Sequence, residues 1–367
     1  TKRFVVGASS RPDGPGAVIG GNERVVRPRL ADAKFFFDQD RKKTLASRVE
    51  GLDKVIYHNK LGTQGERVER VRAMACAIGQ QLGGDVLAKS ADTAAQLAKT
   101  DLLTDMVGEF PELQGIMGGY YARHDGLSED IAFAIEDHYK PRFAGDTLPR
   151  TMTGVVLALA DKLETLVDMF GIGNLPTGDK DPFALRRHAL GVIRMLVEKD
   201  LHLALLPLLN TAYDTFGAQL PLARAEPVEA LASFIYDRLA GTLREQGFSA
   251  QEVDAVLALR PQRLADVAQR LQAVRAFAAL PEAPALAAAN KRIGNILKKS
   301  EGEVAATVRE PLLVEDAELA LYAAMQATVP TANAQFDAGD HTASLQSLAA
   351  LRAPVDAFFN GVMVNVE

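Results

Sequence analysis

The stretch TGVVLALADKLETLVDMFGIG, residues 153–173, decides the fold of this chain. Residues 155–160 are apolar on every side of a helix, whereas a helix at the surface keeps one polar face. The segment is therefore predicted to be a helix at the centre of a core. Helical patterns dominate on both sides of it. Ser128, for example, is a good N-cap for a helix whose first turn carries Glu129 and Asp130. The sequence predicts a mainly α, multi-domain protein.

Strand character is confined to residues 1–29, where glycine and proline punctuate RPDGPG and IGGNERVVRPR. Helix candidates follow at residues 30–52, 64–82 and 91–108. The stretch GNLPTGDKDP, residues 173–182, is the clearest linker, and Asp181 followed by Pro182 predicts the cap and first residue of a new helix. We predict four parts, which are residues 1–57, with a short β-containing N-terminal segment and a long helix, 58–175, 176–280 and 281–367.

The 367 residues suffice for two or three domains, and the formal net charge is −6. An acidic chain does not attract nucleic acid as a whole, so RNA binding requires local basic patches, and no DNA partner is expected. The first thirty residues do not have the pattern of a signal peptide, and no apolar run approaches the roughly 18 residues of a membrane span. We expect a cytoplasmic protein with no membrane contact.

The stretch YYARHDG, residues 120–126, contains the adjacent pair His124 and Asp125. Such a pair is the name-giving element of the HD family of metal phosphohydrolases, in which histidines and aspartates hold metals that activate water. The dipeptide alone is weak evidence, since about 0.4 such pairs are expected by chance in this composition. Its context also differs, because His124 and Asp125 close one helix and precede the cap of the next.

A better alignment to the HD fold places its metal slots elsewhere in the chain. Asp101, in LAKTDLLTDM, takes the place of the aspartate, but Thr100 stands where the histidine belongs. Asp161, in ALADKLETL, matches the distant aspartate. Residues 58–172 therefore resemble the HD fold with its histidines lost, and we expect no metal in this chain. Asp101 and Asp161 are then buried, hydrogen-bonded carboxylates, with Arg123 or Lys162 as candidate partners. The alternative is an active metal centre.

The remaining histidines are scattered along the chain, and each is predicted to be a surface or capping residue rather than a ligand. They are His58, His138, His188, His202 and His341.

The stretch ALAAANKRIGNILKKS, residues 285–300, is a predicted helix with two distinct faces. One face is apolar, and the other carries Lys291, Asn295, Lys298 and Lys299 at helical spacing. Lysines can neutralise phosphates, and an asparagine can read a base edge. The alternative is a solvated helix face. The apolar positions are Leu286, Ala289, Ile293, Ile296 and Leu297.

The stretch DPFALRR, residues 181–187, is a second basic candidate. Arg186 and Arg187 near a helix N-terminus, with Lys180 close in sequence, suit phosphate binding. The alternative is a salt-bridged hinge with Asp179 or Asp181 as partner.

Several long stretches together resemble the β subunit of the bacterial heterotetrameric-type glycyl-tRNA synthetase. They include GNERVVRPRLADAKFFFDQDRKK, EFPELQGIMGGYYARHDG, GDKDPFALRRHALGVIRMLVEK, ALAAANKRIGNILKK and LRAPVDAFFNGVMVNVE. The match implies the C-terminal part of that subunit. Residues 1–57 would then be the end of a preceding body domain, and residues 58–175 would form a degenerate HD-type domain. Residues 176–280 would form a helical linker domain. Residues 281–367 would form a DALR-like anticodon-binding domain, which resembles the one in arginyl-tRNA synthetase.

The resemblance implies a tRNA-binding subunit that recognises tRNA-Gly, while a separate α subunit uses ATP and Mg to make the glycyl adenylate. No adenylate-forming motif is found in this chain, so no catalytic residue and no cofactor of its own are expected. The alternatives are an HD-type phosphohydrolase and a helical scaffold without an RNA role. The resemblance favours RNA binding by the helix at residues 285–300. The predicted tRNA-binding set is Asn290, Lys291, Arg292, Asn295, Lys298, Lys299 and Arg352, together with Lys180, Arg186 and Arg187, for which the salt-bridged hinge stays open as the alternative.

Overall fold

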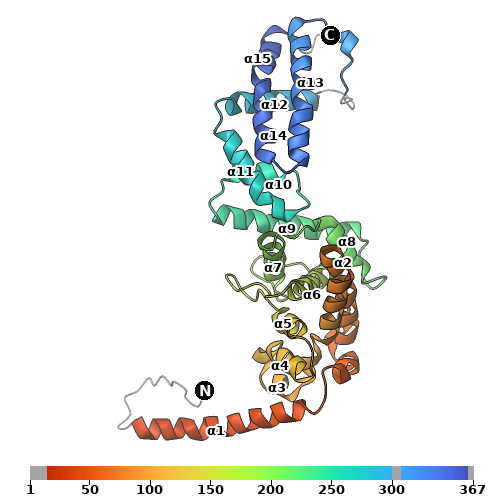
Figure 1. Ribbon diagram of the computed structural model, residues 1–367, viewed down its shortest axis with the longest axis vertical. Helices are drawn as coiled ribbons and strands as arrows, with labels where there is room; N and C mark the ends of the chain where they lie inside the picture. The colour runs from red at the N-terminus through yellow and green to blue at the C-terminus, as the bar shows by residue number, and fades with distance from the viewer. Residues whose placement is uncertain (1–14, 300–306, 363–367) are drawn as a thin grey trace. The chain divides into compact units, whose positions relative to one another are not determined.

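The structure, a computed structural model, describes residues 15–299 and 307–362, and the chain folds into two compact units (Figure 1). The first unit comprises residues up to 195 together with 205–235, and the second comprises 196–204 and the residues from 236 onward. Helices form most of the described residues, and their only sheet is a two-stranded hairpin. The predicted mainly α, multi-domain fold is confirmed, while the four-part division of the chain stays a prediction.

Helix α6 (Met152–Gly171) is the centre of the first unit. All of its residues from Thr153 to Gly171 are buried, as the apolar pattern predicted. It packs against α2 (Gln64–Leu97), α5 (Glu129–Asp137) and α8 (Leu205–Asp214), the last of which the sequence analysis did not predict. The start of α2 is fixed by a capping box between Thr63 and Glu66, and α5 begins at the predicted cap Ser128.

The other elements of the first unit surround these helices. They are α1 (Pro15–Asp40), η1 (Ala46–Lys54), the hairpin β1 (Ile56–His58) and β2 (Gly62–Thr63), η2 (Thr100–Leu103), α3 (Asp105–Glu109), η3 (Pro111–Leu113), α4 (Ile116–His124), most of α7 (Leu185–Glu198) and the first half of α9 (Ala225–Glu245).

The second unit is helical throughout its described residues. Its long helix α13 (Asp316–Asp337) packs against α14 (His341–Leu348) and α15 (Arg352–Gly361), and α12 (Ala283–Lys299) packs against α15 and α11 (Val267–Ala278). The remaining elements are α10 (Ala250–Leu257), η4 (Leu264–Asp266), η5 (Glu310–Leu312) and η6 (Ala349–Leu351). None of the described helices in either unit is long and apolar enough to cross a membrane.

The N-terminal strand prediction is wrong where the structure tests it. Residues 1–14 lie outside the described residues, and residues 15–29 are helical in α1. Pro15 begins this helix, a position where a missing N–H costs nothing, and the Asn22 side chain donates to the Val18 carbonyl at 2.8 Å. The short β segment is instead the antiparallel hairpin, in which Ile56 pairs with Thr63.

Two predicted helices end earlier than expected, and at each end a buried carboxylate accepts hydrogen bonds from backbone amides of another segment. The helix predicted over 30–52 ends at Asp40, whose carboxylate accepts from the Asp105 and Met106 amides at 2.9 and 3.0 Å. The helix predicted over 91–108 ends at Leu97. Asp101 follows, and it accepts from the Gly115 and Gly118 amides at 2.6 and 3.0 Å. Both contacts satisfy N–H groups at starts of other helices, which local periodicity cannot reveal.

Candidate nucleic-acid interface

The polar face of α12 is hollowed in the second unit. A concavity of about 370 Å³ is lined by Ala288, Lys291, Arg292, Asn295, Ile296 and Lys299. Its polar side chains follow the helical repeat, and all of them are exposed. The structure therefore places together Lys291, Arg292, Asn295 and Lys299. Asn290 and Lys298 are also exposed but do not line this hollow.

Helix α15 supports one wall of this site. The Arg292 guanidinium lies 4.2 Å from the centre of the Phe359 ring, an attractive cation–π arrangement. Phe358 meets Phe359 edge to face, with ring centres 5.3 Å apart. Arg352, at the start of α15, lies 3.7 Å from Asp356 in an exposed ion pair and is not part of the hollow's lining.

The opposite face of α12 is less buried than its apolar pattern suggests. Ile293 and Leu297 keep 39% and 50% of their surface exposed, and Ala283 is the one residue counted as buried in this helix. The cause is that α12 has few packing neighbours among the described elements, with α15, α11 and η6 as the main ones.

The second basic candidate, residues 181–187, lies partly before and partly within α7. Helix α7 begins at Leu185 rather than at Pro182, because Ala184 has φ of 54°, outside the right-handed helical region. The Asp181 carboxylate accepts from the Leu185 and Arg186 amides at 2.7 and 3.0 Å. Asp181 therefore bonds to the start of the helix through its side chain, but it lies four residues before Leu185 and is not the residue directly before the helix that was predicted. The Asp181 carboxylate thus already accepts hydrogen bonds from the first amide groups of α7, so these amides are not open to a phosphate.

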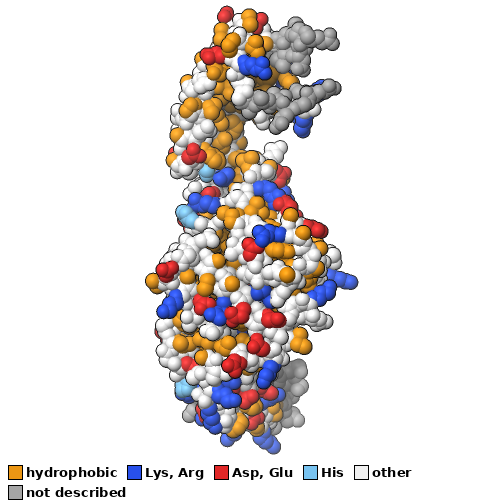
Figure 2. Space-filling view, turned by 90° about the vertical axis from the view of Figure 1, so that its right-hand side faces the viewer, with side chains coloured by type: hydrophobic (Ala, Val, Ile, Leu, Met, Phe, Trp, Pro, Cys, Tyr) orange, Lys and Arg blue, Asp and Glu red, His pale blue; other side chains and the backbone are white. Residues whose placement is uncertain are grey.

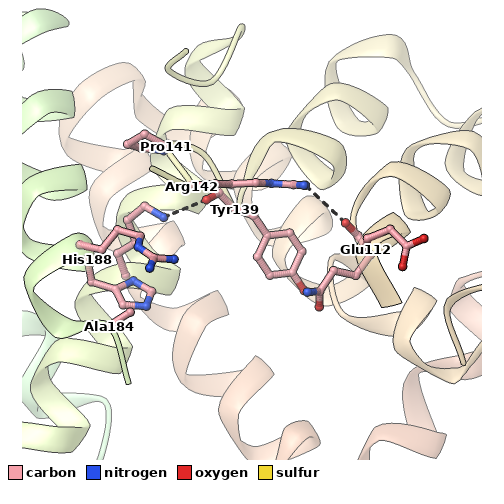
Figure 3. A pocket seen from close by; sticks show the side chains of 9 residues that line it. Glu112, Tyr139, Pro141, Arg142, Ala184 and His188 are labelled. Atoms are coloured by element: carbon pink, nitrogen blue, oxygen red, sulfur yellow. Dashed lines mark hydrogen bonds between the residues drawn. The ribbon is translucent and has the colours of Figure 1, made fainter. Parts of the chain in front are cut away.

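The basic side chains of this segment go different ways. Arg186 bonds to the Gly178 carbonyl in the linker, and exposed Lys180 pairs with Thr177 through the backbone. Arg187 instead lines a cavity of about 330 Å³ with residues from η3, α6 and the turn after α5. In Figure 3, His188 and Glu112 lie on opposite sides of the Tyr139 ring. Sequence reasoning missed this cavity because its walls come from segments far apart in the chain.

Asp101 and Asp161 are both buried, as predicted for bonded carboxylates. Asp101 bonds to the Gly115 and Gly118 amides, and burial raises the pKa of its carboxyl despite these bonds. Asp161 lies 3.0 Å from both Arg67 Nη2 and Lys99 Nζ. Burial alone would raise the pKa of Asp161, but the two cations outweigh it and hold that pKa well below its ordinary value.

The expected partners of these carboxylates were wrong. Arg123 pairs with Glu129 and Glu136, and Lys162 donates to the Tyr139 carbonyl at 3.2 Å. The true partner Arg67 comes from α2 and also binds Glu164 at 2.8 Å. Arg67 lies in residues 64–82, for which the sequence predicted a helix but no buried cation. The buried carboxylates of α6 were the signal that required cations on a facing helix.

His138 is a capping residue, as one of the two predicted alternatives had it, because it is the C-cap of α5, but its side chain is buried rather than at the surface. Its Nδ1 lies 2.6 Å from the Ile135 carbonyl, and its Nε2 lies 2.8 Å from Lys99 Nζ. Burial first, and then Lys99, lower the pKa of His138 well below its ordinary value, so the ring is neutral. A neutral ring that donates from Nδ1 offers Nε2 as an acceptor to the Lys99 ammonium.

The His124–Asp125 pair lies outside this buried cluster. His124 is exposed at the end of α4, with Nδ1 3.0 Å from an Arg41 nitrogen, and Asp125 accepts from the Leu45 amide at 2.7 Å. Among the residues that the structure describes, no group of three or more His, Cys, Asp or Glu side chains is placed to hold a metal ion. The buried Asp161 carboxylate is paired with Arg67 and Lys99.

Comparisons with known proteins agree on one family. A family model described as glycyl-tRNA synthetase beta subunit matches residues 1–258. The chain is 73% identical over 367 residues to the glycine–tRNA ligase beta subunit of Polaromonas naphthalenivorans (strain CJ2), covering 100% of this chain and 51% of that relative. The identity is 72% over 367 residues for the protein of the same name from Delftia acidovorans (strain DSM 14801 / SPH-1), with 100% of this chain and 52% of the relative covered.

The chain spans about half the length of the curated relatives that it matches. The family model covers well over half of the chain itself, and the similarity to the relatives extends over all 367 of its residues. The chain therefore belongs to the glycyl-tRNA synthetase β subunit family.

Proposed function

We propose that this chain is the tRNA-binding part of the β subunit of a glycine–tRNA ligase, which recognises tRNA-Gly for ATP-dependent glycylation by a separate α subunit. The observation that carries the proposal is the hollow on α12, where Lys291, Arg292, Asn295 and Lys299 converge. Ammonium and guanidinium groups bind phosphates, and the asparagine amide offers a donor and an acceptor to a base edge.

The distribution of charge supports local rather than general RNA binding. The chain carries a net charge of −6, and Figure 2 shows basic and acidic side chains interspersed on the face that it draws. Such a surface gives little long-range attraction for a polyanion, so affinity has to come from a compact group of cations. The exposed residues of α12 form such a group in the second unit, where an anticodon-binding domain is proposed for residues 281–367.

The interior of the first unit supports a structural role for the proposed degenerate HD-type domain. The Lys99 ammonium lies between the Asp161 carboxylate and the His138 imidazole, at 3.0 and 2.8 Å. A cationic side chain there already supplies the charge that a metal ion would bring to these two groups. In this proposal, as the resemblance implies, ATP, Mg and the adenylate chemistry belong to the α subunit, which is the proposed partner, and the complex is cytoplasmic.

The test is a binding measurement with tRNA-Gly, with a non-cognate tRNA as control, over a series of salt concentrations. We expect tighter binding of tRNA-Gly and a linear fall of log affinity with log salt. Equal affinity for both tRNAs, or no binding at low salt, would contradict the proposal.

A second measurement addresses catalysis. With glycine, ATP and tRNA but no α subunit, the chain is expected to form no glycyl-tRNA. Detection of glycyl-tRNA under these conditions would place an aminoacylation site in this chain and overturn the division of labour.

A further inference from the structure

The cavity at the start of α7 is enriched in positive charge. Arg142, Lys162 and Arg187 line it together with one carboxylate, Glu112. Its volume of about 330 Å³ is at the lower end of the range of small-ligand sites. All of its lining residues belong to the first unit.

Lys162 is the buried cation of this cavity, with 3% of its surface exposed. Its Nζ donates to the Tyr139 carbonyl at 3.2 Å, while the neighbouring Asp161 is already paired with Arg67 and Lys99. Burial, opposed only in part by Asp161, lowers the pKa of Lys162 to about 8. A buried ammonium that is incompletely compensated gains stability from an anion beside it.

Gly191 on α7 leaves room for the Lys162 stem. A Cβ on Gly191 would lie 3.0 Å from Lys162 Cε and 3.4 Å from Pro141 Cδ, closer than such contacts normally are. Glycine at this position therefore lets the lysine reach the cavity that Pro141 also lines.

Two further features, one on α7 and one just before its first residue, point to a ligand. His188 Nδ1 is buried without a hydrogen-bond partner among the described residues, and burial lowers the pKa of His188 to about 3, so the ring is neutral. A neutral imidazole can carry its proton on Nδ1 and donate it to an anion. Ala184, also in the lining, holds φ of 54°, a conformation that costs a non-glycine residue about 1 kcal/mol or more and that gathers at ligand sites.

The two arginines of the cavity differ in how firmly they are held. Arg142 makes a long contact of 3.5 Å to the Gln114 carbonyl and lies 5.7 Å from the centre of the Tyr139 ring (Figure 3). Arg187 is exposed and has no hydrogen-bond or ion-pair partner within the described residues. Both guanidinium groups are available to an incoming anion.

We propose that this cavity binds a phosphomonoester, with Arg187, Arg142 and Lys162 as the cations that hold its phosphate group. Guanidinium groups match phosphate oxygens in pairs, and an ammonium acts on them as a point charge. A phosphomonoester has three terminal oxygens that can bind the three cations. Its single ester substituent can extend out of the cavity into solvent. A chain phosphodiester has two free oxygens and two substituents, which fits a site with a buried cation less well. The site does not depend on the function proposed for α12.

The test is calorimetric titration of the chain with inorganic phosphate and with AMP at low salt, and with adenosine as the control that lacks the phosphate. We expect phosphate and AMP to bind and adenosine not to bind. The variant Arg187→Ala is expected to bind AMP about tenfold or more weakly, because a hydrogen bond to a charged group contributes about 1.5–3 kcal/mol. The variant Arg186→Ala is the matched control, since its guanidinium bonds to Gly178 outside the cavity, and its affinity should stay within about twofold of the wild type.

Competition with short RNA distinguishes the two sources of a phosphomonoester. Displacement of AMP by a 5′-phosphorylated oligonucleotide, but not by its 5′-hydroxyl form, identifies a nucleic-acid end, and no displacement by either identifies a small phosphorylated molecule. Equal displacement by both would overturn the phosphomonoester assignment in favour of a backbone site. The proposal also fails if neither phosphate nor AMP binds, if adenosine binds as well as AMP, or if Arg187→Ala and Arg186→Ala behave alike. No tRNA is used, so this result is separate from the test of tRNA recognition.

Discussion

The buried network around α6 and the exposed face of α12 use the same kinds of cation in opposite ways. In the first unit, Arg67 and Lys99 both lie 3.0 Å from Asp161, and all three side chains are buried. In the second unit, Lys291 and Lys299 are exposed and line a hollow. Lysine and arginine occur in both places. What distinguishes a cation that stabilises the fold from one that can bind a ligand is whether it is buried and whether it is paired with a carboxylate.

The difference has an energetic basis. A buried cation has lost its hydration and depends on its carboxylate, so removing that carboxylate leaves an uncompensated charge in a dry interior. An exposed lysine keeps its hydration and contributes little to stability, so it can be changed freely or used to neutralise a phosphate. Four measurements can break or sharpen this contrast.

The largest effect is expected from Asp161→Asn. The change leaves Arg67 and Lys99 without their shared carboxylate, and the free energy of unfolding should fall by about 3–5 kcal/mol, the usual cost of breaking a buried ion pair. Urea unfolding followed by circular dichroism measures it. Asp92→Asn is the control, because the Asp92–Arg72 pair is partly exposed and should contribute about 1 kcal/mol or less. Similar losses in the two variants would show that burial does not govern these pairs.

The next effect concerns the α12 face. Changing Lys291, Lys298 and Lys299 together to alanine should weaken tRNA binding and lower the log–log salt slope by up to about 0.9 for each lysine that contacts a phosphate. The fold should survive, since exposed changes usually stay within about 0.5 kcal/mol. Replacing exposed Lys42, Lys43 and Lys54 by alanine removes the same charge from the first unit and should leave the slope unchanged. Unaltered affinity and slope in the α12 variant would show that this helix does not face the RNA.

Acid titration should separate the two buried aspartates of the first unit. The folded-state pKa of Asp161 is below its unfolded value of about 3.9. Its stabilisation is therefore present above about pH 4 and is lost as the pH falls through the folded pKa, by at most about 1.4 kcal/mol per pH unit. The gap in unfolding free energy between wild type and Asp161→Asn should narrow below about pH 4.

Asp101→Asn is the control of opposite sign. Burial raises the pKa of Asp101, so its contribution is greatest below the unfolded pKa and declines as the pH rises through the folded pKa. The difference in unfolding free energy between wild type and Asp101→Asn should therefore increase as the pH falls. Urea unfolding at a series of pH values checks both, and a parallel response of the two variants would contradict the assigned pKa directions.

The smallest effect is expected from Asn295→Ala. A base contact through this amide would contribute about 1 kcal/mol, and its loss should narrow the gap between tRNA-Gly and other tRNAs. The salt slope should stay constant, because a base contact releases no phosphate counterion. Affinities for both tRNAs at several salt concentrations measure this, and a uniform loss for both would assign Asn295 to the backbone instead.

The sequence by itself determined the helical class and much of the candidate interface. The apolar run of α6 fixed its burial, and Ser128 and the helical spacing of Lys291, Asn295 and Lys299 placed a cap and an exposed polar face correctly. These features are local, because capping and periodicity depend on residues within a few positions of one another.

Only the tertiary structure decided which charged groups meet. Asp161 finds Arg67 and Lys99 from 94 and 62 positions earlier in the chain, and Asp101 ends a predicted helix because it bonds to the start of α4. Arg186 and Arg187 are adjacent in sequence, but the Arg186 side chain bonds to Gly178 in the linker. Arg187 instead lines a cavity with residues as distant in sequence as Glu112. A buried charge is stable only beside a partner, and the partner is chosen by how helices pack, which no local pattern encodes.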